Sequence, residues 1–245
     1  MTDRGYELSA QFYDLFDRKP NINFYYFYAS QAGESLDIGA GTGRIAVPLA
    51  ELGCRLFCVE PSEAMRTQLE QKLEQQPSLL ERINIVPTDA ASFKLNKTFP
   101  LAMMSGSFRH FLTDEERLRA LANISAHLKP GGTLVFDISL GMMKDTPLSP
   151  AGEVQIDGGE IRRSLSTRVL PEGVLQVTFV FETYRGGRMV ERIVQGAVQG
   201  IITRQQITRL LQETGLTVVN EYADYDFRPY EEGDNILMIE ACKTN

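Results

Sequence analysis

The chain has 245 residues, with 25 Lys and Arg against 32 Asp and Glu, which gives a net charge of −7. At about 100–200 residues per domain, this length predicts one large domain, or one domain with an insertion. Hydrophobic residues make up 43% and charged residues 23%, which are ordinary values for a globular protein and exclude global disorder. The acidic balance argues against a nucleic-acid binder that works by broad phosphate neutralisation, so we expect no nucleic-acid partner.

Cysteines and histidines are few and widely spaced. Cys54, Cys58 and Cys242 form no CxxC pair, so a reducing cytoplasm is the simplest setting. His110 and His127 are far from the HExxH spacing, which excludes a histidine-rich metal site, and we expect no metal. The N-terminus lacks an apolar signal core, and no apolar run of about 18 residues occurs, so we expect no membrane partner.

The first half of the chain predicts alternating strands and helices after an aromatic-rich segment, residues 6–30, that we expect to be irregular. Ser62 and Thr113 are each placed to cap the start of a helix. Such alternation implies parallel pairing through right-handed crossovers, and therefore an α/β, doubly wound, Rossmann-like sheet. The expected strands are 36–38, 55–59, 82–86, 101–104 and 133–138, and the expected helices are 44–52, 62–75 and 113–128.

The second half begins with a different pattern. Residues from about 153 to 201 alternate with period two, so that Leu175, Val177 and Phe179 share one face of a strand. Residues 171–173 and 185–187 have the composition of hairpin turns. This pattern predicts an antiparallel β insertion within the domain. The rest of the chain predicts a helix over 203–214 and closing strands over 216–221 and 235–242.

A glycine-rich segment, residues 37–43, lies between the first expected strand and the following helix. Glycines there permit a tight turn and a close approach of a ligand to the backbone, and the helix start supplies free N–H donors. The alternative is a tight turn that binds nothing. Glu60 ends the next strand, about 20 residues after the loop, where a carboxylate can accept both hydroxyls of a ribose. Arg44 stands where the dinucleotide fingerprint needs glycine, and no P-loop motif occurs, so the pattern disfavours NAD.

The stretch from about Tyr13 to Leu140 resembles the class I S-adenosylmethionine-dependent methyltransferases. Residues 37–43 resemble their first motif and Glu60 their acidic ribose ligand. Residues 88–90 resemble the segment whose aspartate meets the adenine, and residues 128–132 resemble a late motif. The resemblance implies a mostly parallel seven-stranded sheet with an antiparallel last strand. The β insertion is similar to that of a small-molecule branch that includes sugar-amine N-methyltransferases.

The resemblance also implies the cofactor, S-adenosylmethionine, with S-adenosylhomocysteine as product. It divides a single domain, 1–245, into an N-terminal lid (1–34), a cofactor-binding core (35–145), the antiparallel insertion (150–201) and a last helix with a strand pair (202–245). The residues expected to bind the cofactor are Asp37, Gly39, Ala40, Gly41, Gly43, Glu60, Pro61, Asp89, Ala90 and Ser105.

Three residues are candidates for the catalytic step. His110 follows the fourth strand and can accept a proton near neutral pH, although it can equally pack into the following helix while Phe108 and Phe111 face the site. Tyr13 resembles the tyrosine that folds over the cofactor in this family, against the alternative of ordinary packing. Arg228 lies in the last loop and can bind the substrate or form a surface ion pair. His127, late in a helix, is expected to be structural because a cation suits the helix dipole there.

These features predict a methyltransferase that acts on nitrogen or oxygen of a small-molecule acceptor, as a cytoplasmic monomer or homodimer. One alternative is an RNA or protein methyltransferase. Another is a non-catalytic, S-adenosylmethionine-binding regulatory protein. Only about twenty residues separate Tyr13 from the first strand, so the lid must be short.

Overall fold

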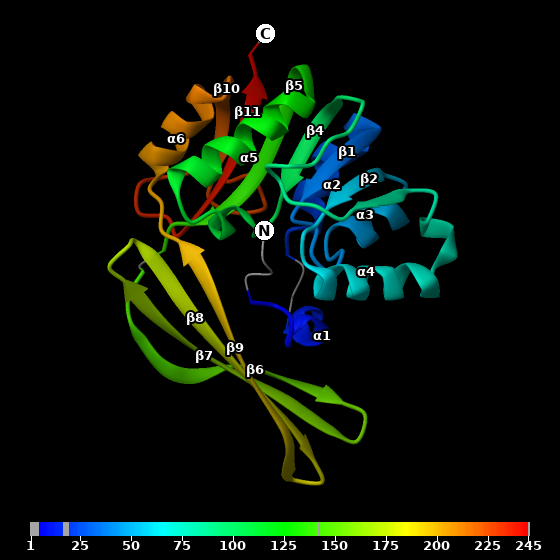
Figure 1. Ribbon diagram of the computed structural model, residues 1–245, viewed down its shortest axis with the longest axis vertical. Helices are drawn as coiled ribbons and strands as arrows, with labels where there is room; N and C mark the ends of the chain where they lie inside the picture. Colours follow the sequence, from blue (N-terminus) through cyan, green and yellow to red (C-terminus); the bar gives the residue numbers. More distant parts are fainter. Residues whose placement is uncertain (1–4, 17–19, 142, 245) are drawn as a thin grey trace.

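The main sheet has seven strands in the order β10-β11-β5-β4-β1-β2-β3 (Figure 1). The computed structural model describes residues 5–16, 20–141 and 143–244, so the start of the chain, where no signal core is expected, lies outside the described residues. β11 pairs antiparallel with both β10 and β5, and the other pairings given for this sheet are parallel, which confirms the predicted α/β fold. The strands are β1 Glu34–Ile38, β2 Arg55–Val59, β3 Ile83–Val86, β4 Phe99–Met104, β5 Leu128–Ser139, β10 Leu216–Tyr222 and β11 Ile236–Lys243.

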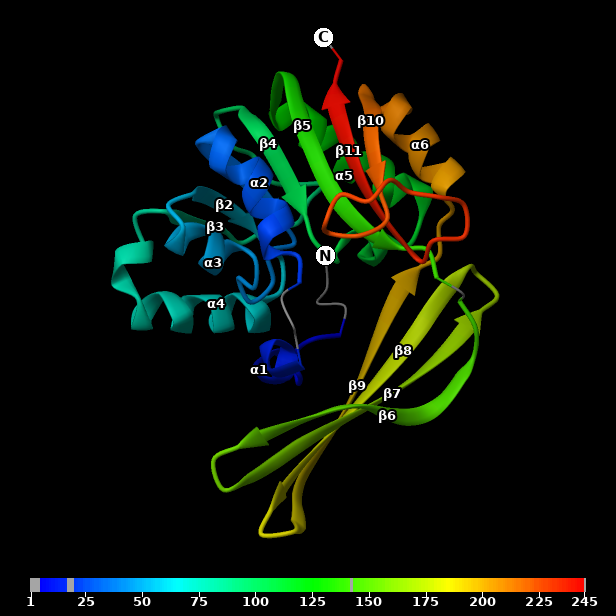
Figure 2. The same cartoon turned by 180° about the vertical axis from the view of Figure 1, so that it is seen from behind.

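Helices cover both faces of this sheet and bury a separate apolar cluster on each (Figures 1 and 2). Their predicted caps are present: the Ser62 hydroxyl accepts from the Met65 N–H at 3.3 Å, and Thr113 accepts from the Glu116 N–H at 3.2 Å. One face carries α5 Asp114–His127 and α6 Arg204–Glu213; the other carries α2 Ile22–Ala32, α3 Ala46–Glu51 and α4 Glu63–Gln75.

The insertion forms a separate four-stranded antiparallel sheet, in the order β6-β7-β8-β9. It begins earlier than the predicted position near residue 153, because residues 146–150 (TPLSP) pair with β7 without any period-two alternation. Proline is tolerated there because β6 is an edge strand. The strands are β6 Thr146–Ile156, β7 Gly159–Leu170, β8 Val174–Arg185 and β9 Arg188–Gly200.

The expectation of an irregular segment over residues 6–30 is wrong. The structure forms α1 (Ala10–Tyr13), a single 3-10 turn and then α2 over eleven residues. Phe24 and Tyr25 of α2 are fully buried against the sheet. Burial of such large aromatic side chains outweighs their weak intrinsic preference for helix, and this long-range packing is absent from the local pattern.

Residues 5–16, called here the N-terminal segment, lie between the two sheets (Figures 1 and 2). The ring of Phe12 stacks on that of Phe181 in β8, with centroids 5.0 Å apart. Gly5 crosses β9 so closely that a Cβ there would lie 2.0 Å from the carbonyl oxygen of Gly196. The insertion sheet and the N-terminal segment therefore form one wall over the carboxyl ends of the parallel strands.

Candidate functional site

A cavity lies at the carboxyl ends of β1 and β4, where the strand order reverses, which is the usual place for ligands in open α/β sheets. The glycine loop forms its floor. Gly41 has a φ of +58° and a Cβ there would meet only open space, so its backbone can be approached by a ligand. Gly43 serves packing instead, since a Cβ on it would lie 2.4 Å from Leu69 Cδ1 of α4.

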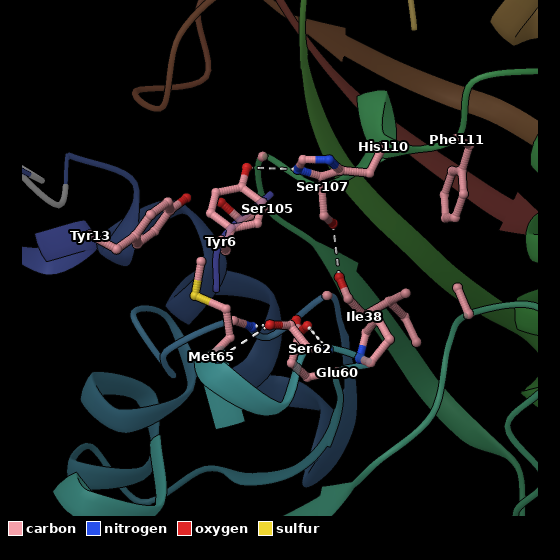
Figure 3. Close-up of a pocket in the computed structure, with 15 residues that line it drawn as sticks. Tyr6, Tyr13, Ile38, Glu60, Ser62, Met65, Ser105, Ser107, His110 and Phe111 are labelled. Atoms are coloured by element: carbon pink, nitrogen blue, oxygen red, sulfur yellow. Dashed lines mark hydrogen bonds between the residues drawn. The ribbon is translucent and has the colours of Figure 1, made fainter. Parts of the chain in front are cut away.

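Glu60, at the end of β2, faces this first cavity (Figure 3). Its side chain is buried, with an exposed fraction of 7% for the residue. One carboxylate oxygen accepts from the Gly41 N–H and the other from the Ser62 N–H, both at 2.8 Å. The carboxylate therefore holds the glycine loop and the start of α4 together at the wall of the cavity.

The cavity brings together six of the ten residues expected to bind the cofactor. Ala90 belongs to the turn in which Asp89 Oδ1 accepts from the Ala91 N–H at 2.8 Å. Those that line the cavity are Gly39, Gly41, Glu60, Pro61, Ala90 and Ser105, and those that do not are Asp37, Ala40, Gly43 and Asp89.

Asp37 lies behind the glycine loop with an exposed fraction of 2%. Burial is the main cause that raises the pKa of this carboxyl; the Arg44 guanidinium opposes the shift and the negative charge of Glu60 adds to it, with a resulting pKa of about 7. Its Oδ2 has no hydrogen-bond partner within the described part of the chain. The carboxyl is therefore close to half-protonated at neutral pH.

A buried carboxylate network anchors the wall formed by Ser105 and Gly106. Asp137 of β5 accepts from the Ser105 hydroxyl at 3.1 Å and from the Gly106 N–H at 2.6 Å. The hydroxyls of Tyr25 and Tyr225 donate to the same carboxylate at 2.9 and 3.1 Å. Burial first, and then the negative charge of Asp137, raise the pKa of both tyrosines, which keeps them protonated as donors. In the sequence, the sign of this network is Asp137 itself, an acidic residue inside an apolar strand.

His110 ends a 3-10 turn after β4 and lines the cavity (Figure 3). Its Nε2 lies 3.0 Å from the hydroxyl oxygen of Tyr6, so the two side chains form a hydrogen-bonded pair. Phe108 is fully buried and stacks on Phe136, so the alternative in which it faces the site is wrong; Phe111 does line the cavity. Tyr6 was not singled out from the sequence, because nothing local marks its contact with residue 110.

Two other sequence-based candidates have contrasting positions. Tyr13 of α1 lines the cavity and packs edge-on against Tyr6, with centroids 5.9 Å apart. Arg228 does not line it: its guanidinium is ion-paired with Asp224 at 3.2 Å and Asp234 at 2.7 Å. The structure thus shows the surface ion pair at Arg228 that was the alternative expected from the sequence.

His127 is held as a neutral imidazole, which corrects the helix-dipole explanation. Its Nδ1 donates to the carbonyl oxygen of Asn123 at 2.8 Å, while its Nε2 accepts from the Leu95 N–H at 3.1 Å. A protonated Nε2 cannot accept a hydrogen bond. The role is structural, since the ring ties α5 to the loop that precedes β4.

A second cavity of about 350 Å³ adjoins the first, and Tyr6, Tyr13 and Gly106 line both. Much of its lining comes from the N-terminal segment and from the inner face of the insertion sheet, and Asn21, Arg44 and Tyr225 add to it from the core. Two arginines, Arg44 and Arg163, line it and were missed from the sequence as candidate site residues. Arg163 is paired in register with Phe181 and so shares the inward face of the sheet, where a charge interrupts the apolar alternation.

Comparison with known proteins identifies the family. Residues 36–132 match the family model described as a methyltransferase domain. The cypemycin N-terminal methyltransferase of Streptomyces sp. is 30% identical over 216 residues, which cover 83% of this chain and 80% of that protein. The chain belongs to the S-adenosylmethionine-dependent methyltransferases. An uncharacterized methyltransferase of Geobacillus sp. (strain WCH70) is 34% identical over 136 residues, but the match spans 54% of this chain and only 61% of that relative.

Solved structures share the fold of this methyltransferase at low sequence identity. An S-adenosylmethionine-dependent methyltransferase from Clostridium acetobutylicum superposes with a TM-score of 0.81 and 16% identity, covering 98% of this chain and 99% of that one. The sugar N-methyltransferase KedS8 from Streptoalloteichus sp. superposes with a TM-score of 0.75 and 20% identity, covering 95% and 93%. The β insertion is therefore part of a fold found in other methyltransferases.

Two further findings concern residues 5–16, 20–141 and 143–244 only. No helix in these ranges is long and apolar enough to cross a membrane. No group of three or more His, Cys, Asp or Glu side chains in them is placed to hold a metal ion.

Proposed function

We propose that this methyltransferase transfers the methyl group of S-adenosylmethionine to an amine nitrogen of a small molecule. The observation that carries the proposal is the pair of cavities that meet at Tyr6, Tyr13 and Gly106. The first has the glycine loop and an acidic strand end, and the second has a volume within the usual range for small-molecule sites.

The first cavity fits the cofactor on the chemistry of its lining. Glu60 presents a buried carboxylate, which suits ribose hydroxyls, beside the open backbone of Gly41. Ala90 lines the end proposed for the adenine, with Asp89 next to it in the chain, and Ser105 precedes Gly106, which lines both cavities. Bound there, S-adenosylmethionine supplies an electrophilic methyl group, and S-adenosylhomocysteine remains as the product.

The chain then has to orient the amine, keep it neutral and remove a proton. Orientation supplies ~7–11 kcal/mol in reactions of this kind, and a positioned base a further ~10²–10⁴-fold. The second cavity is lined by Arg44 and Arg163 and, among its described lining residues, by no carboxylate. Positive charge disfavours the protonated amine, which exposes the lone pair. His110 is placed to take up the released proton through the hydroxyl of Tyr6.

The relatives support nitrogen over oxygen as the acceptor atom. The names of the cypemycin relative and of KedS8 describe an N-terminal methyltransferase and a sugar N-methyltransferase. The match over 80% of the cypemycin enzyme makes a peptide amino terminus the second candidate acceptor.

The same proposal includes a cytoplasmic monomer or homodimer that binds no nucleic acid. Cys54, Cys58 and Cys242 are free thiols, and the first two are buried, which suits a reducing compartment. The overall charge of −7 disfavours nucleic acid as a partner.

Calorimetry and a labelling assay test the proposal together. S-adenosylmethionine and S-adenosylhomocysteine should bind, whereas NAD should not. Radiolabelled methyl should then move to members of a panel of small amines, with short peptides and alcohols as comparison. Tight NAD binding would overturn the cofactor assignment. Cofactor binding without transfer to any acceptor would favour the regulatory alternative.

A further inference from the structure

Arg163 of β7 points its guanidinium to the second cavity, beside the ring of Phe16 at 4.6 Å from the centroid. A guanidinium has five N–H donors. Arg163 Nη2 donates to the carbonyl oxygen of Ala151 at 2.9 Å, while Nε is buried with no hydrogen-bond partner within the described ranges. Much of the donor capacity of this side chain is therefore unused.

Two other arginines of the insertion sheet have acidic partners and so contrast with this position. Arg162, the neighbour on the opposite face of β7, is ion-paired with Glu160 and lies 3.5 Å from Glu153. Arg192 of β9 pairs with Glu182 at 3.3 Å. In the part of the chain that the structure describes, no carboxylate lies within ion-pair distance of Arg163. Burial accordingly lowers its pKa, since no acidic partner offsets the loss of solvent.

The backbone around Arg163 leaves room for the guanidinium. Gly152 of β6 is its partner in register and has a φ of +144°. A Cβ there would lie 3.0 Å from Phe16 Cδ1 and 3.9 Å from Arg163 Nη2, so a larger residue would press the ring onto the guanidinium. The second cation of the cavity, Arg44, already donates to Asn21 Oδ1 and Ser105 Oγ, each at 2.8 Å.

The remaining wall of the cavity is aromatic. Four phenylalanine rings line it and present apolar surface beside the guanidinium of Arg163. These residues are Phe12, Phe16, Phe179 and Phe181.

We propose that Arg163 binds a carboxylate of the methyl acceptor, whose apolar part lies against the phenylalanine rings. The inference rests on the proposed function and names its substrate class: amines that also carry a carboxylate. The planar fork of a guanidinium matches a carboxylate with two parallel hydrogen bonds. A single guanidinium of this kind suits a monoanion better than a phosphate dianion, because the second arginine is already engaged by Asn21 and Ser105.

Binding to the enzyme loaded with S-adenosylhomocysteine tests the inference by calorimetry. The probes are 3-phenylpropanoate, hippurate and benzoate, each compared with its amide, and 2-phenylethyl phosphate. At least one carboxylate should bind ten-fold or more tighter than its amide. R163M should lose ~10- to 100-fold of that affinity, and R163K should recover part of it. R162M, an exposed control on the same strand, should bind like the wild type.

Kinetics on the same proteins separate this inference from the proposed function. With L-phenylalanine and L-phenylalaninamide as acceptors, R163M should raise KM for the carboxylate by a much larger factor than KM for the amide. If no carboxylate of the panel binds, or the phosphate binds more tightly than any of them, the assignment of Arg163 is wrong. If neutral amines are methylated in that case, the proposed function stands without it; if S-adenosylhomocysteine fails to bind, the proposed function itself has failed.

Discussion

Replacing Asp37 by asparagine should make folding stability less dependent on pH. The carboxyl has a folded-state pKa of about 7 against an ordinary value of 3.8, because burial disfavours its charged form. The native state therefore holds the proton more tightly than the unfolded state does. Stability from this group is fully present below pH 3.8 and is lost as the pH rises towards the folded-state value.

The magnitude follows from the two pKa values. The pKa of Asp37 is about three units higher in the folded state, which corresponds to a total loss of ~4 kcal/mol in the free energy of unfolding as the pH rises, at ~1.4 kcal/mol per pKa unit. About half of this, ~2 kcal/mol, falls between pH 5.5 and pH 8, because the unfolded chain is already mostly ionised at pH 5.5. Asp37→Asn keeps the shape of the side chain and removes the titration.

Urea unfolding of both proteins at pH 5.5 and pH 8 measures the effect. From pH 5.5 to pH 8, the free energy of unfolding of the wild type should fall by ~2 kcal/mol more than that of the variant. Costs of the substitution that do not depend on pH, such as an unpaired buried amide, cancel in this difference. Equal losses in the two proteins would refute the idea that Asp37 titrates near neutral pH.

Four more substitutions separate binding, packing and catalysis. Glu60→Ala should weaken S-adenosylhomocysteine binding at least ten-fold in calorimetry, since hydrogen bonds to a charged group contribute ~1.5–3 kcal/mol each; a smaller loss would count against its role with the ribose. Gly43→Ala should lower the free energy of unfolding by ~1–3 kcal/mol in urea, because its Cβ would overlap Leu69; an unchanged midpoint would show that α4 adapts. His110→Ala should lower turnover ~10²-fold or more with cofactor affinity intact, and Tyr6→Phe should do so less strongly; unchanged turnover in both would leave orientation as the whole mechanism.

Local signals predicted much of the fold. The caps at Ser62 and Thr113 and the glycine turn at 186–187 depend on neighbours within a few residues, so the sequence pattern is sufficient for them. The glycine loop and Glu60 were found because their spacing is fixed by one strand–helix–strand unit.

The parts that were missed depend on contacts between distant residues. The pairing of Tyr6 with His110 spans 104 positions, and helix α2 forms because its aromatic side chains meet a sheet assembled from later strands. Arg163 could have been noticed in the sequence, because it places a charge on the inward face of an alternating strand. Its cavity, however, forms only when the N-terminal segment packs on the insertion sheet.

The rate of methyl transfer to an amine and to the alcohol of the same skeleton, at saturating S-adenosylmethionine, tests the central claim most directly. Mass spectrometry of both mixtures identifies the methylated product and the atom that carries the methyl group. We expect the amine to be methylated at nitrogen and the alcohol to be left unchanged. Transfer to the alcohol alone, or to no small molecule while the cofactor is bound, would contradict the account.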